Sequence, residues 1–164
     1  MTITVREAHP IEFQAIGELT VAAYSAYLEA VDDAGYRAEL LDVAGRAAVC
    51  PIYVALDDET GRVVGGAMYV PGPGPFAESE RAGEAGIRML AVDPAAQRRG
   101  VGRALTNALI DRARADGRQR IALLSLTSMT AAHAMYLGLG FRRALDRDWE
   151  VEPGMLLLGF ELDL

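Results

Sequence analysis

The segment that most constrains the fold is residues 90–103, where an apolar strand pattern ends in a turn and a glycine-bearing loop then opens a helix. The strand ends in three apolar residues, Leu90, Ala91 and Val92. Gly100 and Gly102 have no Cβ, so a ligand can approach the backbone of the loop closely. The order of strand, loop and helix predicts a domain that mixes α and β structure.

Three arginines, Arg98, Arg99 and Arg103, lie where this helix begins. The N-terminus of a helix carries partial positive charge, so cations are unfavourable there unless an anion binds among them. The free N–H groups of the first helical turn are themselves donors for phosphate. The segment therefore predicts a site for an anion of about the size of pyrophosphate. An ordinary strand-to-helix connection with a polar cap is the alternative.

Two common phosphate loops do not fit this segment. The P-loop pattern needs a lysine followed by Ser or Thr, and all 16 basic residues of this chain are arginines. A dinucleotide-binding fingerprint needs a third glycine, but Arg103-Ala104-Leu105 follows Gly102. Neither pattern therefore explains the glycines of the loop.

The pattern that remains, Gln97-x-x-Gly100-x-Gly102 after a strand ending Val92-Asp93-Pro94, resembles motif A of the GCN5-related N-acetyltransferases, the GNAT superfamily. In that superfamily the loop amides hold the pyrophosphate of acetyl-CoA. The resemblance implies acetyl-CoA as cosubstrate, no metal, and cofactor contacts from Leu90, Ala91, Val92, Gln97, Arg98, Arg99, Gly100, Val101, Gly102, Arg103 and Tyr136. It also implies a bulged strand whose backbone meets the pantetheine arm at Leu90 and Val92 and donates an N–H to the oxyanion near Met89 and Leu90.

A second segment, residues 131–141, resembles motif B of the same superfamily, which ends in a tyrosine followed by Gly-Phe. Tyr136 matches that tyrosine, which is thought to protonate the leaving CoA thiolate. The alternative is a buried core tyrosine with a backbone partner. Many relatives carry an asparagine seven residues earlier, where this chain has Met129. His133 lies one helical turn before Tyr136 and either assists proton transfer or is structurally bonded.

Apolar periodicity and turn signals predict eleven elements in the order β-α-α-β-β-β-α-β-α-β-β, the order of the GNAT fold. This predicts an α/β (α+β) fold, a mixed, mostly antiparallel central sheet flanked by helices, in a single domain over residues 1–164. The predicted ranges include a helix over residues 36–48, a short strand over 141–145 and a final strand over 155–164. In the final strand, Glu161 and Asp163 are predicted to face outward.

Composition limits the function further. A length of 164 residues with 51% hydrophobic residues predicts one globular domain. The single cysteine, Cys50, excludes an intrachain disulfide and a cysteine-based zinc site. Because neither a signal peptide nor an apolar run long enough for a bilayer is visible, we expect a cytoplasmic protein with no membrane partner. The net charge of −7 argues against nucleic-acid binding and is compatible with a cationic acceptor.

The resemblance implies direct transfer, in which a neutral amine attacks the bound thioester in a ternary complex, so a group must first take a proton from the amine. Relatives that use a carboxylate on the strand before the loop place it where this chain has Gly86. Glu84 lies on the same strand face and is the candidate general base, beside Tyr136 as the other catalytic residue. Glu78 and Glu80 are further candidates; a surface role for each carboxylate, or a water chain without a single base, is the alternative.

Arg88 is predicted to share the strand face of Gly86 and Leu90, where it either binds an acceptor carboxylate or forms an ion pair. Taken together, the chain is interpreted as an N-acetyltransferase for a primary amine on a small molecule or a peptide N-terminus. A non-catalytic acyl-CoA-binding or sensor domain is the first alternative, and an unrelated nucleotide-phosphate-binding α/β protein is the second. A homodimer through the apolar C-terminal strand is possible.

Overall fold

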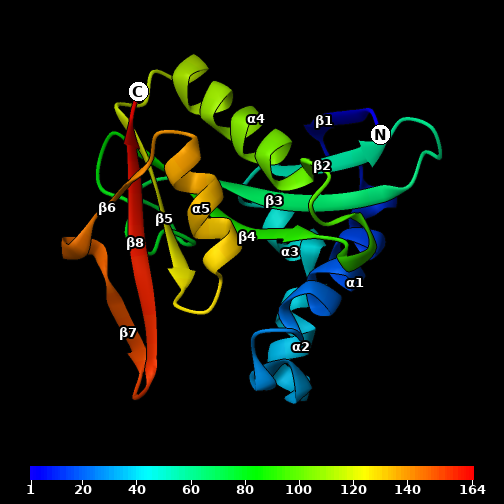
Figure 1. Ribbon diagram of the computed structural model, residues 1–164, viewed down its shortest axis with the longest axis horizontal. Coiled ribbons are helices and arrows are strands. Elements are labelled where there is room, and N and C mark those ends of the chain that lie inside the picture. Colours follow the sequence, from blue (N-terminus) through cyan, green and yellow to red (C-terminus); the bar gives the residue numbers. More distant parts are fainter. The chain divides into compact units, whose positions relative to one another are not determined.

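A computed structural model describes the backbone of residues 1–164 and all side chains except those of residues 30 and 31. The chain forms two compact units, Met1–Tyr69 with Met89–Ala108 and Val70–Arg88 with Leu109–Leu164. Three elements, labelled in Figure 1, have residues assigned to both units: β3 (Val63–Pro71), β4 (Glu84–Val92) and α4 (Val101–Ala115). A single domain over residues 1–164 stays a prediction.

The strands pair in the order β1-β2-β3-β4-β5-β8-β6, and β7 pairs with β8. The pairing of β4 with β5 is parallel, and those of β1 with β2, β2 with β3, and β8 with β5, β6 and β7 are antiparallel. The remaining elements are β1 (Ile3–Glu7), α1 (Phe13–Tyr24), α2 (Ala34–Leu41), α3 (Val43–Ala47), β2 (Ile52–Asp57), β5 (Arg120–Leu126), α5 (Thr130–Gly138), β6 (Arg142–Arg143), β7 (Trp149–Glu152) and β8 (Met155–Asp163). The predicted fold class, a mixed and mostly antiparallel sheet with helices, is confirmed.

Three boundaries differ from the prediction. The helix expected over residues 36–48 is divided into α2 and α3, because Asp42 leaves the helical region and its carboxylate accepts a hydrogen bond from the N–H of Gly45. The strand expected over residues 141–145 is limited to the two residues of β6. Strand β7 was not predicted, because its four residues are all exposed and carry no buried face for a pattern to reveal.

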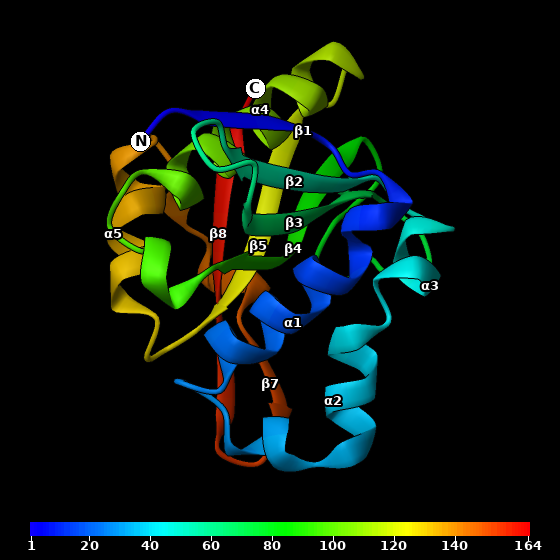
Figure 2. The same cartoon turned by 90° about the vertical axis from the view of Figure 1, so that its right-hand side faces the viewer.

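In the first unit, two adjacent glycines of β3 let helices approach both faces of the strand. A Cβ on Gly65 would lie 2.7 Å from the side chain of Val101 in α4, and a Cβ on Gly66 would lie 2.8 Å from Ile16 in α1. Successive strand residues point to opposite faces. Gly65 therefore leaves room for α4 on one face, and Gly66 leaves room for α1 on the other. Figure 2 shows α1 beside α2, where a Cβ on Gly17 would lie 3.1 Å from the backbone of Leu41.

In the second unit, α5 packs its aromatic face on β8. The ring of Tyr136 lies 5.8 Å from the ring of Phe160 and 5.5 Å from that of Phe141. Strand β8 pairs with β5 along one edge and with β6 and β7 along the other. The apolar C-terminal strand is therefore interior, so a homodimer, which stays a prediction, would not use a free edge of β8.

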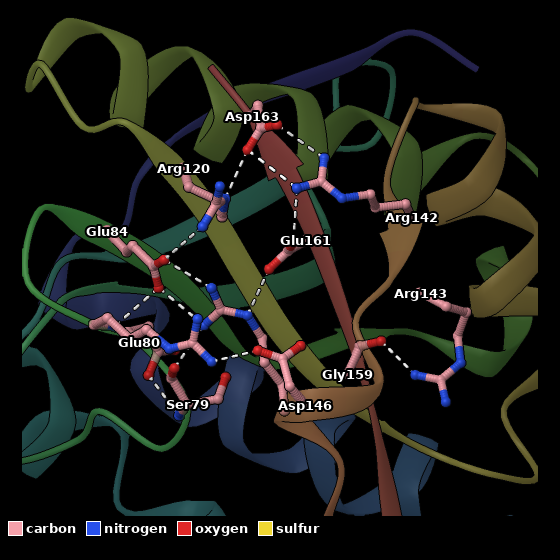
Figure 3. Close-up of polar contacts among 12 residues, drawn as sticks. Ser79, Glu80, Glu84, Arg120, Arg142, Arg143, Asp146, Gly159, Glu161 and Asp163 are labelled. Atoms are coloured by element: carbon pink, nitrogen blue, oxygen red, sulfur yellow. Dashed lines mark hydrogen bonds and ion pairs between the residues drawn. The ribbon is translucent and has the colours of Figure 1, made fainter.

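Near Glu84 and Glu161, which Figure 3 labels, the second unit also contains the buried guanidinium of Arg147, in a 3-10 turn before β7. Its side chain is 1% exposed and donates two hydrogen bonds to Glu84, at 2.9 and 2.7 Å. A third goes to Glu161 at 2.7 Å and a fourth to the carbonyl oxygen of Ser79 at 2.7 Å. Arg147 thus joins β4, β8 and the loop between β3 and β4.

Glu161 was predicted to face outward, and this prediction is wrong. Its side chain is only 11% exposed and lies between Arg147 and Arg142, whose guanidinium is 2.6 Å away. The pleat does turn Glu161 away from Phe160, but arginines rather than water cover that face. Asp163 is 56% exposed, as predicted. Hydrogen bonds from Arg142 and Arg120 lower the pKa of Asp163 to about 2.

We predict that Arg147→Met lowers the free energy of unfolding by about 3–5 kcal/mol, because Glu84 and Glu161 would then be buried without their shared cation. Urea denaturation followed by circular dichroism measures this change. Arg114→Met is the matched control, because Arg114 pairs with Asp111 at 3.7 Å with both side chains more than half exposed. Such a pair contributes about 0–1 kcal/mol. Equal losses in the two variants would contradict the prediction.

Candidate active site

Strand β4 is interrupted shortly before the glycine loop. Met89 has a φ of +53°, a left-handed conformation that is uncommon for a residue with a side chain. The parallel register of β4 with β5 covers Glu84–Ile87, which is the part of the strand before this residue. A local break of the extended backbone at Met89 agrees with the bulge that the resemblance implies. The N–H groups of Met89 and Leu90 as oxyanion donors stay a prediction.

A rigid turn connects β4 to the loop. The N–H of Asp93 donates to the carbonyl oxygen of Val64 in β3 at 2.9 Å. The carboxylate of Asp93 accepts a hydrogen bond from the N–H of Ala95 at 2.9 Å and caps the 3-10 turn Pro94–Ala96. Gln97 follows with an extended backbone. The turn therefore fixes the point at which the loop begins.

The loop itself contains two left-handed residues, Arg98 with a φ of +64° and Gly100 with a φ of +85°. A Cβ on Gly100 would meet no atom within 4 Å, so the glycine is required for its conformation and leaves open space above the backbone. The carbonyl oxygen of Gly100 accepts the N–H of Ala104 at 2.9 Å, within the first turn of α4. The N–H groups of that turn are left for a ligand or water.

The three arginines of the loop, Arg98, Arg99 and Arg103, are exposed and lie near the start of α4 in the sequence. None of them has an ion pair or side-chain hydrogen bond with another described residue. Val101, next to them, is 1% exposed and anchors the start of α4 in the core. Unpaired cations on a helix N-terminus with open space at Gly100 fit a pyrophosphate, as acetyl-CoA carries.

Tyr136 lies in α5, in the second unit, and is 5% exposed. Burial raises the pKa of its hydroxyl above the ordinary value, so the group stays protonated at neutral pH. It is therefore able to donate a hydrogen bond and is not a base at that pH, while its role as the acid that protonates the CoA thiolate stays a prediction. One turn earlier, Nε2 of His133 lies 3.1 Å from Oγ of Ser125, and burial lowers the pKa of His133. The structure thus favours the structurally bonded histidine.

The carboxylate of Glu84 accepts hydrogen bonds from several donors. Besides Arg147, it accepts hydrogen bonds from Arg120 at 3.3 Å and from the N–H of Arg81 at 2.9 Å. Burial alone would raise the pKa of Glu84, but the hydrogen bond from Arg147, with these others, outweighs burial and lowers it. A carboxylate whose oxygens accept these hydrogen bonds, and whose pKa is lowered, is a poor proton acceptor. The geometry favours a structural role, and the general-base role stays an untested prediction.

The other predicted carboxylates lie on the loop between β3 and β4. Glu78 forms an ion pair with Arg88 at 2.7 Å, and Arg88 also donates to the carbonyl oxygen of Phe76 at 3.1 Å. Burial and, less strongly, the charge of Glu80 raise the pKa of Glu78, although Arg88 opposes the shift. Of the two roles expected for Arg88, the structure therefore favours the ion pair, and its partner is Glu78 of the loop. Glu80 lies over Gly86 and has no ion pair among the described residues.

Arg147 was not recognised from the sequence. It stands between Asp146 and Asp148, a pattern typical of a solvated surface segment, and no spacing signal marks it as buried. Among the residues described by the structure, no group of three or more His, Cys, Asp or Glu side chains has the arrangement to hold a metal ion. Within the same residues, no helix is both long and apolar enough to cross a membrane.

Comparison with known proteins assigns this arrangement to a family. The model of the Acetyltransferase (GNAT) family matches residues 13–141. Mycothiol acetyltransferase of Amycolatopsis mediterranei (strain U-32) is 41% identical over 91 residues, which are 54% of this chain and 29% of that protein. The chain thus matches less than a third of that relative's length.

Two solved structures show the same fold over nearly the whole chain. A GCN5-related N-acetyltransferase from Kribbella flavida has a TM-score of 0.73 and 26% identity, with 99% of this chain and 98% of that chain covered. An acetyltransferase-like protein from Salmonella typhimurium, whose structure contains its cofactor acetyl-CoA, has a TM-score of 0.71 and 22% identity, with 100% and 95% covered. Because the family model spans most of the sequence, including the loop and Tyr136, this chain belongs to the acetyltransferase (GNAT) family of acyltransferases.

Proposed function

We propose that the protein is an N-acetyltransferase that uses acetyl-CoA to acetylate a primary amine of a small molecule or of a peptide N-terminus. The observation that carries this proposal is the start of α4, where three exposed arginines without an ion pair to another described residue flank Gly100 in the sequence, and the backbone at Gly100 is open. A family fold alone does not identify a reaction. A loop built for a multiply charged anion, in a chain of this family, supports acetyl-CoA as the donor.

In this proposal, residues Gln97–Arg103 hold the pyrophosphate through backbone N–H groups and arginine side chains. The backbone of Leu90, Ala91 and Val92 binds the pantetheine arm. When bound, acetyl-CoA supplies an activated acetyl thioester. The N–H groups near Met89 and Leu90 stabilise the negative charge that develops on the carbonyl oxygen. The protonated hydroxyl of Tyr136 supplies the proton that the leaving sulfur needs.

The acceptor is proposed only as a class. A net charge of −7 favours a cationic acceptor over an anionic one, because the surface field attracts an ammonium group. The relative from Amycolatopsis mediterranei is named mycothiol acetyltransferase, and the part of it that matches here is too short to assign the same substrate to this chain. A cytoplasmic location and a homodimer stay predictions.

The proposal is tested by measuring CoA release from acetyl-CoA against polyamines, aminoglycosides, free amino acids and short peptides with free N-termini. A thiol reagent reports turnover, and a control without acceptor corrects for Cys50. We expect turnover with one chemical class of amine. Binding of acetyl-CoA without turnover by any amine would favour the sensor alternative. Competition by ATP as effective as that by CoA would favour a nucleotide-binding protein.

We predict that Gly100→Leu weakens acetyl-CoA binding at least tenfold, which corresponds to about 1.4 kcal/mol, because a side chain fills the open space over the loop. Gly61→Leu is the matched control. Gly61 also has a positive φ, of +70°, and a Cβ added there would meet no atom within 4 Å, but it lies in the turn after β2. Both variants lose about 1–2 kcal/mol of stability from the strained backbone. Isothermal titration calorimetry separates them, and equal affinities would contradict the loop assignment.

We predict that Tyr136→Phe lowers kcat about 100-fold, within the range of a lost general acid, and leaves the Kd for acetyl-CoA unchanged. Phenylalanine fits the position, because the ring of Tyr136 is surrounded by Phe141 and Phe160. Steady-state kinetics with the best amine of the panel measures the effect, and thermal denaturation checks the fold. A variant with the kcat of the parent protein would show that Tyr136 only packs.

A further inference from the structure

Glu80 occupies space that two glycines leave free. A Cβ on Gly86 would overlap Oε1 of Glu80 and would lie 2.7 Å from its Cγ. A Cβ on Gly72 would lie 2.6 Å from the Cβ of Glu80. Gly86 is buried in β4 and Gly72 is buried at the start of the loop. The side chain of a loop residue therefore lies where a side chain from β4 would begin.

The two oxygens of the Glu80 carboxylate differ. Oε2 accepts hydrogen bonds from the N–H of Glu78 at 2.7 Å and from that of Ser79 at 3.1 Å. Oε1, over Gly86, has no hydrogen-bond partner among the described residues. One oxygen is thus fixed by the backbone, and the other keeps its lone pairs for a further donor.

The loop that carries Glu80 is fixed by arginines. Arg147 donates to the carbonyl oxygen of Ser79 at 2.7 Å, directly before Glu80. Figure 3 shows Ser79 and Glu80 below Glu84. Arg118 donates to the carbonyl oxygen of Gly72 at 3.2 Å. Arg88 holds Phe76 and Glu78. The position of Glu80 is therefore set before any ligand binds, as an efficient proton acceptor requires.

Glu80 forms no ion pair with another described residue, unlike the carboxylates next to it. Glu78 and Arg88 neutralise each other, and Glu84 is taken by Arg147 and Arg120. Arg81, the next residue in the chain, pairs with Asp146 at 2.6 Å. A cationic ammonium group is attracted to a carboxylate whose neighbours are already paired. Glu80 thus keeps an oxygen without a hydrogen-bond partner among the described residues, whereas both oxygens of Glu84 are bound by donors.

We propose that Glu80 is the catalytic base of the reaction, acting on the acceptor amine directly or through one water molecule; this inference rests on the proposed function. The ammonium form of the acceptor gives one proton to the carboxylate of Glu80. Its nitrogen then forms the bond to the acetyl carbon, and the carbon–sulfur bond of acetyl-CoA breaks. The leaving thiolate takes the proton of the Tyr136 hydroxyl, and the second proton lost from nitrogen restores that hydroxyl. The products are the acetamide, CoA thiol and the proton held by Glu80.

The position of Glu80 is tested without turnover, by a double-mutant cycle in urea denaturation. Gly86→Ala should lower the midpoint of the parent protein, because the new methyl group overlaps the Glu80 carboxylate. In the Glu80→Ala background the same substitution should leave the midpoint unchanged. An equal loss in both backgrounds would show that Glu80 does not occupy the space over Gly86, and would overturn the inference.

The catalytic role is tested by kinetics with the amine that gives the highest turnover in the panel. Glu80→Gln should lower kcat about 100-fold and leave the calorimetric Kd for acetyl-CoA unchanged. Glu59→Gln, an exposed glutamate in the turn after β2, is the charge-matched control and should keep the parent kcat. The relocation variant Glu80→Ala with Gly86→Glu supplies a carboxylate from β4 and should recover at least a tenth of the parent rate.

The outcomes separate this inference from the function on which it rests. If the parent protein turns over an amine and Glu80→Gln keeps kcat within threefold, the base assignment is overturned and the function stands. If the parent protein binds acetyl-CoA and acetylates no amine, the proposed function fails, and the assignment fails with it. A loss in Glu80→Gln that the relocated carboxylate repairs supports both.

Discussion

The contacts of the Arg147 guanidinium hold the elements of the second unit together. It is almost fully buried, and it binds one carboxylate from β4, one from β8 and a carbonyl oxygen of the loop between β3 and β4. A buried charge is costly unless it is paired and hydrogen-bonded. Loss of any of these partners therefore leaves a buried N–H of the guanidinium without an acceptor, so a shift of the loop away from the two strands is costly.

This constraint has a consequence for the chemistry. Because Glu84 neutralises Arg147, its carboxylate is committed to the fold, although its place on β4 first suggested a general base. The same guanidinium fixes Ser79 and thereby the residue after it, Glu80. Gly86 completes the arrangement, since any side chain at that position would displace the Glu80 carboxylate. Arg147 thus binds the carboxylate of Glu84 in the fold and fixes the loop at Ser79, while Glu80 keeps an oxygen without a partner among the described residues.

The sequence was informative where a local rule requires a particular residue. Gly100 leaves open space above the loop backbone, as the absence of a Cβ there predicted, and the arginines near it have no ion pair with another described residue. It was uninformative where the decisive contact is distant in the chain. Arg147 reads as part of a polar surface turn, yet its partner Glu84 is 63 positions away. Glu161 was expected in water, because alternation along a strand identifies a face but not what covers that face.

The central claim is that the acetyl group of acetyl-CoA moves to nitrogen. The most direct measurement is carbon NMR of a reaction with acetyl-CoA that is labelled with carbon-13 in the acetyl carbonyl, in the presence of the amine panel. The account predicts that the thioester signal is replaced by an amide carbonyl signal of one acceptor class. Appearance of the label only as free acetate, or its persistence as thioester on the bound cofactor, would contradict the account.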